Sequence, residues 1–276
     1  MAIKNIVFPK NTMFDIEQSI TDETPVTVTN GKDKKFFVIP KNPKMYLKPF
    51  NSSEFIGQEL CTIRNIRCTY YFIAAIGLFD IKGSCWYQDV EKQRPRLVIG
   101  SYDFKHTGYQ YKNVEDYGFS RFDEDLFSKM LTVAPDEENR RQLMNDMMQM
   151  LALDIYMGQT DRGYFNFLFE EDENHHIRLA PIFDFECSLN TQFFGQHEDK
   201  ITLGDLYHFN TIEDCKEFIR RYPMFGSLLN SYLYEDLESV VKSAYGKRRM
   251  IVPDDCLKKY QEFDEDRKEL IKRIVH

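Results

Sequence analysis

The hydrophobic and polar positions of the chain change their spacing partway along it. Before residue 104, short β-branched and aromatic runs alternate with prolines, glycines and lysines, a pattern typical of strands joined by turns. From about residue 136, apolar residues recur every three or four positions, which is the spacing of helices with one buried face. This order predicts an α+β protein with a β-rich first part and a helical second part.

The first part should begin with an antiparallel sheet. Short strands are predicted at residues 25–29, 36–39 and 45–48, each bounded by proline or turn residues. Asn30 and Gly31, between the first two, form a strong signal for a tight turn. We therefore expect neighbouring strands of this group to pair with each other.

A helix is predicted to follow these strands. Ser52 or Ser53 can serve as its N-cap, because a serine hydroxyl accepts a hydrogen bond from the first turn. Ile56, Leu60 and Ile63 then recur at helical spacing and define its expected buried face.

The boundary between the two parts is set by a change in character. Residues 70–104 return to a strand-like pattern, most clearly at 97–99, whereas 105–125 are polar and show no clean periodicity. We interpret 105–125 as a connection and divide the chain into a β-rich lobe, 1–104, and a helical lobe, 105–276.

The second part should contain one long helix and a hairpin. A helix is predicted over residues 137–157, a hairpin over 165–179 with an acidic turn, and further helices over 204–276. The apolar residues at helical intervals in the long helix are Leu143, Met147, Met150, Leu151 and Ile155.

Composition narrows the class of protein. A net charge of -8 over 276 residues argues against nucleic-acid binding as the main role. No apolar run approaches the roughly 20 residues that span a bilayer, and the N-terminus shows no secretory leader. The six cysteines form no C-x-x-C pair, so we expect reduced thiols in a cytoplasmic protein. Secretion by a route that needs no signal peptide stays open.

The most informative residues are Asp161, Asn166 and Asp184. The first two lie in the loop after the long helix, and the third ends the returning strand of the hairpin. One end of the hairpin should therefore bring all three together. Phosphoryl transfer from ATP needs such a set, with one carboxylate to orient the attacking hydroxyl and oxygen ligands for Mg²⁺. The alternative is that Asp161 and Asn166 only satisfy loop backbone.

Lys48 supplies a second candidate, because a lysine at the end of a short strand can reach nucleotide phosphates. Such a lysine needs a carboxylate to position it, and the following helix offers Glu54 and Glu59. Glu59 flanks the expected apolar face, so we choose it over Glu54. A surface lysine is the alternative. The loop from Gly31 to Lys34 could cover the phosphates through its amides and lysines, or be an ordinary charged turn.

These residues resemble the HipA-like serine/threonine kinases, including the compact CtkA-type members. That family carries a D-x-H-x-x-N-F pattern, followed by a strand ending in R-L-x-P-x-Y-D. The chain has D-R-G-Y-F-N-F at 161–167 and R-L-A-P-I-F-D at 178–184, with both spacings kept. The resemblance covers roughly residues 25–190.

The resemblance implies a bilobal protein-kinase-like fold, ATP and Mg²⁺ as cofactors, and a protein hydroxyl as acceptor. It implies Asp161 as catalytic base, Asn166 and Asp184 as metal ligands, and Lys48 as the nucleotide-binding lysine. It also implies that Gly31 to Lys34 form the phosphate loop. The hinge strand that meets adenine would include Ile99, Ser101 and Tyr102.

Three departures from the family leave alternatives open. Gly163 stands where the family usually has His, and Asn30 stands where many members have Ser. The extra N-terminal domain of full-length HipA toxins has no counterpart, so pairing with an antitoxin is not implied. A nucleotide-binding pseudokinase acting as an interaction module is one alternative, and a kinase with a small-molecule or lipid acceptor is another. Outside the site, His175, His176 and the basic run 247–249 are expected to be solvated.

Overall fold

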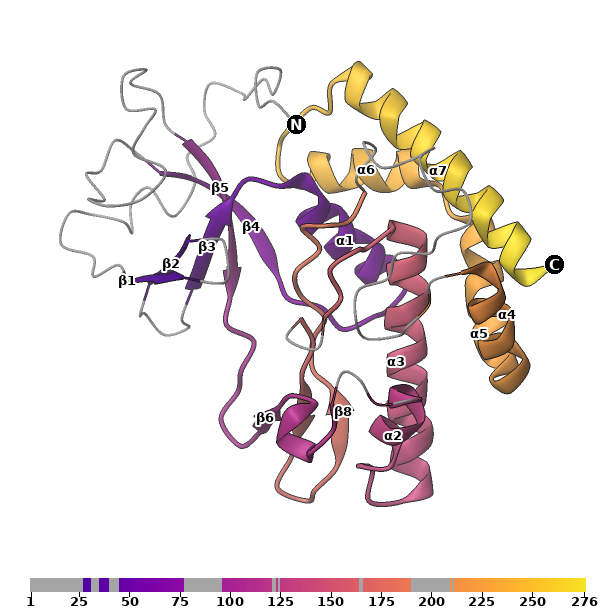
Figure 1. The fold of residues 1–276 in the computed structure, drawn as a ribbon. Helices are drawn as coiled ribbons and strands as arrows, with labels where there is room; N and C mark the ends of the chain where they lie inside the picture. Colours follow the sequence, from indigo (N-terminus) through magenta and orange to yellow (C-terminus); the bar gives the residue numbers. More distant parts are fainter. Residues whose placement is uncertain are drawn as a thin grey trace.

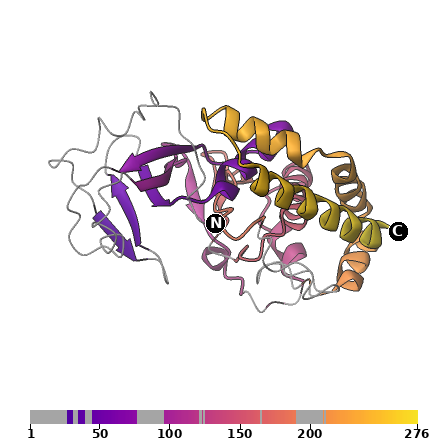
Figure 2. The ribbon, with the colours of Figure 1, turned by 90° about the horizontal axis from the view of Figure 1, so that it is seen from above.

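The structure is a computed structural model. It describes residues 27–30, 35–39, 45–76, 96–120, 123, 125–163, 166–189, 209 and 211–276. Within these ranges the chain forms a five-stranded sheet, a three-stranded sheet and a group of helices. The larger sheet lies on one side and most helices lie on the other, with α1 and α3 near the middle (Figures 1 and 2). No helix of this described part combines the length and apolar character needed to cross a bilayer.

The larger sheet is antiparallel throughout and runs in the order β1-β2-β3-β5-β4. The predicted strands near the N-terminus and at 97–99 are confirmed, although their ends shift by a few residues. Because β5 pairs with β3, Lys48 lies directly opposite Ile99. The strands are β1 (Thr27–Asn30), β2 (Lys35–Ile39), β3 (Met45–Pro49), β4 (Tyr71–Ile76) and β5 (Arg96–Tyr102).

Helix α1 (Ser52–Ile63) connects β3 to β4. Its N-cap is Asn51, whose side chain accepts from the amide of Ser53, so the expected serine cap is wrong by one residue. Ile56 and Leu60 are fully buried, as predicted. Ile63 is 51% exposed, contrary to the prediction, because the last turn of α1 lies beyond the packed part of the helix.

The smaller sheet shows that the segment 105–125, which we interpreted as a connection, contains secondary structure. This segment contributes β6 (Gln110–Lys112) and a short 3₁₀ helix, η3 (Glu115–Tyr117). β6 pairs with β7 (Phe169–Glu171), which pairs with β8 (Ile177–Leu179). A three-residue strand shows no periodicity of its own, and its partner is more than 50 residues away in sequence.

The predicted hairpin exists, but β7 begins four residues later than the predicted start at 165.

The helical part is organised around α3, whose predicted range of 137–157 is confirmed. All five residues of its predicted apolar stripe are completely buried. This helix packs against β8, α5 and α7, so it forms the centre of the helical part. The other helices are α2 (Leu126–Leu131), α4 (Ile212–Arg221), α5 (Pro223–Ser231), η4 (Tyr232–Tyr234), α6 (Leu237–Gly246) and α7 (Asp254–Val275).

Helix α1 is also held from its far side by α6. Lys247 and Arg249 are exposed, as expected for the basic run 247–249, whereas Arg248 is half-buried. Lys247 donates to both carboxylate oxygens of Glu59, each at 2.7 Å. Arg248 donates to Gln58 at 2.8 Å, and its guanidinium lies 4.7 Å from the ring centre of Phe55. The basic run thus fastens the end of α6 to α1.

One close approach restricts how α1 packs on the segment after β8. A Cβ atom at Gly57 would lie 2.6 Å from the ring of Phe185, a side chain that is fully buried. Only a residue without a side chain therefore allows the helix and the ring to meet at this distance.

We expect Gly57→Ala to lower the free energy of unfolding by about 1–3 kcal/mol, because the added methyl group overpacks the contact with Phe185. Gly246→Ala is the matched control, since a Cβ there meets no atom within 4 Å. Denaturant unfolding of both variants tests the packing. Equal stability of the two would show that Phe185 yields without cost.

Candidate active site

Lys48 joins β3 to two other segments of the chain. Its ammonium donates to a carboxylate oxygen of Asp184 at 2.9 Å and is ion-paired with Glu54. A carboxylate oxygen of Glu186 lies 3.9 Å away. The side chain of Glu54 has no exposed surface and that of Lys48 is 11% exposed, so solvent screens their attraction only weakly.

The choice of Glu59 as the partner of Lys48 is wrong. Glu59 accepts from Ser243 at 2.8 Å and pairs with Lys247, both near the end of α6. Five residues along a helix correspond to a rotation of about 140°, so Glu54 and Glu59 point in different directions. Because α1 is buried against α6 as well as near the sheet, an apolar flank does not identify the side that faces Lys48.

The segment that carries Asp184 is fixed mainly through its backbone. Asp184 has φ of 62°, in the left-handed region, and its amide donates to the hydroxyl of Tyr71 at 2.8 Å. Burial raises the pKa of Tyr71 well above its usual value, so this hydroxyl stays neutral. The next amide, of Phe185, donates to Glu54 at 2.9 Å. Glu54 therefore holds Lys48 and the Asp184 segment together.

The loop before the hairpin places Asp161 and Asn166 beside each other. The side-chain amide of Asn166 donates to the carbonyl of Asp161, and its backbone amide donates to the carbonyl of Gly163 at 2.9 Å. Asp161 is exposed. The buried side chain of Gln159 ties this loop to the Asp184 carbonyl at 2.7 Å.

Arg162 is a residue of this site that the sequence analysis missed. It has no exposed surface and makes two hydrogen bonds, of 2.9 and 3.0 Å, to Asp154 of α3. Burial raises the pKa of Asp154, and the guanidinium opposes that shift. A pair eight residues apart across the end of a helix matches no local spacing rule, so the sequence offered no signal for it.

A cavity of about 360 Å³ lies between the larger sheet and the hairpin. This volume falls within the range of about 300–1,000 Å³ that small-molecule sites occupy. Asp161 does not line the cavity, and Gly31 and Lys34 lie outside the described residues. The predicted residues that do line it are Lys48, Ile99, Ser101, Tyr102, Asn166 and Asp184.

The cavity also has walls that the prediction did not include. Tyr46 donates to the carboxylate of Asp103 at 3.2 Å near the end of β5, and both residues line the cavity. Phe183 lines it from the hairpin side. In the sequence, the only indication of Tyr46, Asp103 and Phe183 was that each lies within two positions of a predicted residue, namely Lys48, Tyr102 and Asp184.

The carboxylate oxygens around Lys48 lie close enough together to bind a metal ion. Carboxylate oxygens of Glu54, Asp184 and Glu186 lie within 4.8 Å of one another. Mg²⁺ prefers carboxylate and amide oxygen ligands, and Asn166 faces the same cavity as Asp184. Asp184, Asn166 and Glu186 are therefore the residues that could hold the metal, and Glu186 is an addition to the predicted set.

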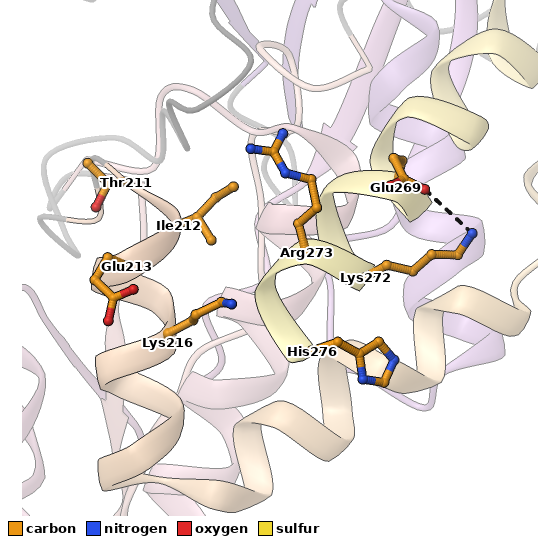
Figure 3. A pocket seen from close by; sticks show the side chains of 8 residues that line it. All are labelled: Thr211, Ile212, Glu213, Lys216, Glu269, Lys272, Arg273 and His276. Carbon is orange, nitrogen blue, oxygen red and sulfur yellow. Dashed lines mark ion pairs between the residues drawn. The ribbon is translucent and has the colours of Figure 1, made fainter.

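A second hollow, of about 710 Å³, is shallower and lies between α4 and the end of α7. Figure 3 shows its lining, with Lys216 on α4 and Arg273 on α7, and Glu269 pairs with Lys272 at 3.6 Å. None of the predicted site residues lies there. We therefore assign the chemistry to the smaller cavity.

The arrangement of these elements is that of a kinase-like fold. No family model matches the sequence, and no curated protein shows significant similarity to it. The structure is similar to that of the proinflammatory kinase CtkA of Helicobacter pylori, with a TM-score of 0.54 and 14% identity, covering 87% of this chain and 92% of that one.

The structure is also similar to that of HipA from the toxin–antitoxin system of Shewanella oneidensis MR-1, which was solved with HipB and operator DNA. The TM-score is 0.54 and the identity 10%, over 91% of this chain and 63% of that chain. This chain thus spans less than two thirds of the HipA chain. The predicted resemblance to HipA-like and CtkA-type proteins is confirmed, at the level of the fold.

We expect Glu54→Gln to weaken the binding of Mg²⁺–ATP about tenfold or more, because Lys48 loses a buried charged partner. Glu59→Gln is the matched control on the same helix, and it should cost at most about 1 kcal/mol of stability without affecting the nucleotide. Calorimetric titration of both variants decides between the two carboxylates. Loss of binding in Glu59→Gln alone would restore the original choice.

Proposed function

We propose that the protein is an ATP-dependent serine/threonine kinase of the HipA-like type, which transfers the γ-phosphate to a hydroxyl of a protein substrate. The observation that carries this proposal is the contact of Lys48 with Glu54 and Asp184 at the wall of a cavity. A lysine held by a helix carboxylate, beside a second carboxylate suited to magnesium, is the set of groups that phosphoryl transfer needs.

The cavity suggests how the nucleotide would bind. The end of β5, from Ile99 to Tyr102, lines the side away from the hairpin, where backbone and ring surfaces can receive adenine. Lys48 lies between this strand and Asp184, so its ammonium is placed to bind phosphate oxygens. In this proposal residues 1–104 and 105–276 form the two lobes of the kinase, with the cleft between them.

Asp161 and the metal ligands would carry the chemical step. Asn166 and Asp184, with Glu186 close by, would hold Mg²⁺, which when bound neutralises charge on the phosphates. Asp161 is exposed and does not line the cavity, so in this proposal an acceptor reaches it from solvent. It would orient the acceptor hydroxyl and take its proton as the phosphoryl group moves.

A nucleotide-binding pseudokinase is the second candidate, and Gly163 is the observation that favours it. This position beside Asp161 carries no side chain, and a Cβ built there meets no atom within 4 Å. The loop therefore has an open space next to the proposed base. In the pseudokinase alternative the nucleotide binds without turnover.

We expect the purified protein to bind ATP in a Mg²⁺-dependent manner, and Asp184→Ala to remove that dependence because a metal ligand is lost. Asp161→Asn should bind nucleotide normally but transfer phosphate about 100-fold or more slowly. Glu173→Gln, in the exposed turn of the hairpin, is the control for a changed surface carboxylate. Calorimetry and phosphate transfer to a generic protein acceptor measure the two effects. A well-folded wild type that binds no ATP would rule out the proposed function.

Gly163→His separates the active kinase from the pseudokinase. We expect this variant to unfold at the same temperature as the wild type, since the added side chain enters open space, and wild type and variant both to transfer phosphate. An inactive wild type with unimpaired ATP binding would support the pseudokinase. Activity gained only in the variant would identify the missing side chain as the reason.

A further inference from the structure

Arg162 contacts three segments of the candidate site at once. Its guanidinium forms a fork with Asp154, at 2.9 and 3.0 Å, and so is anchored to α3. Its remaining nitrogen, Nη1, donates to the carbonyl of Asn166 at 2.8 Å and to that of Phe183 at 2.6 Å. Arg162 itself follows directly after the proposed base.

The two carbonyls belong to the positions that matter for the metal. Asn166 is one proposed magnesium ligand, and Phe183 immediately precedes the other, Asp184. The same guanidinium lies 5.7 Å from the ring centre of Phe185, on the other side of Asp184. The backbones that carry the two ligands are thus bonded to a single side-chain nitrogen.

The free-energy cost of burying Arg162 and Asp154 indicates that the pair serves to fix the geometry of the site. Both side chains have no exposed surface, and burying two charges costs more than their attraction returns unless their hydrogen bonds are satisfied. Apolar residues of similar size would often fill such a place at no loss of stability. What they could not supply is the planar fork that reaches a carboxylate and two carbonyls together.

Gly163 has no side chain that could take over this function, and a Cβ there would meet no atom of the described residues within 4 Å. Gln159 adds one bond to the carbonyl of Asp184, at 2.7 Å, but does not contact Asn166 in the hydrogen bonds found among the described residues. Arg162 therefore links Asn166 directly to the residue before Asp184, in addition to the backbone hydrogen bond from Ala180 to Leu168 in the hairpin.

We propose that Arg162, anchored by Asp154, is a positioning residue that presets the separation of the two magnesium ligands before the metal binds. The inference rests on the proposed function, because it assigns Arg162 to the metal site of that cleft. It predicts a specific defect: loss of the fork should weaken metal binding while leaving the contacts of Lys48 and of the cavity with metal-free nucleotide intact.

The test uses the double variant Asp154→Leu/Arg162→Met, which removes both buried charges, and Arg162→Lys, which keeps the charge but not the fork. Mn²⁺ binding to the ATP-saturated protein is measured by electron paramagnetic resonance, and metal-free ATP binding by calorimetry. We expect the metal concentration for half-saturation to rise about tenfold or more in both variants. Metal-free ATP affinity should stay within about twofold of the wild type.

Arg267→Met is the matched control, because Arg267 is also a buried arginine that donates to a carbonyl of α3, that of Ile155, and Ile155 does not line the cavity. Its metal affinity should be that of the wild type. Arg162→Lys decides the outcome if the double variant does not fold.

Two results would overturn the inference. One is unchanged Mn²⁺ affinity in a folded Arg162 variant, and the other is an equal loss of metal and metal-free ATP binding, which indicates general loosening. A wild type that binds metal-free ATP but not Mn²⁺ would likewise contradict it. A wild type that binds no ATP in any condition contradicts the proposed function itself.

Discussion

The ion pair between Lys48 and Glu54 is the interaction on which the cleft depends. Glu54 is completely buried, and a buried carboxylate is stable in its charged form only beside a cation or several hydrogen-bond donors. It receives both, from Lys48 of β3 and from the amide of Phe185. Removing one partner of such a pair costs about 3–5 kcal/mol because the other charge stays buried. The sheet, α1 and the Asp184 segment are therefore joined at one point.

A close contact, a hydrogen bond and a second ion pair reinforce this electrostatic constraint from both sides of α1. Gly57 lets the helix approach Phe185 closely, and Asn51 at the start of the helix donates to the carbonyl of Glu186 at 2.7 Å. On its other side, α1 is tied to the end of α6 through Glu59 and Lys247. The helix that carries the partner of Lys48 is thus also held by the end of α6, far along the chain.

Much of the fold could be predicted because its signals are local. The stripe of α3 and the strand patterns depend on neighbouring residues alone, and the spacing from Asn166 to Asp184 lies along one short segment whose two ends line the same cavity. Contacts between distant segments could not be predicted in this way. β6 acquires its structure from β7, and Lys247 finds its partner on a helix almost 200 residues earlier. Ile63 has the spacing of a buried position, but it is exposed because it lies in the last turn of α1, beyond the packed part of the helix.

By itself the sequence determined the order of strands and helices, and it brought Lys48, Asn166 and Asp184 into one candidate site. The order of elements follows from backbone propensity, the pairing of Asn166 with Asp184 from their spacing around a single hairpin, and the choice of Lys48 from its place at the end of a short strand. Only the tertiary structure decided that Glu54 rather than Glu59 meets Lys48, and that Arg162 bonds the loop to the strand before Asp184. Each of these contacts depends on the direction of a side chain relative to elements far away in sequence, and periodicity along one helix carries no information about which neighbour each face will meet.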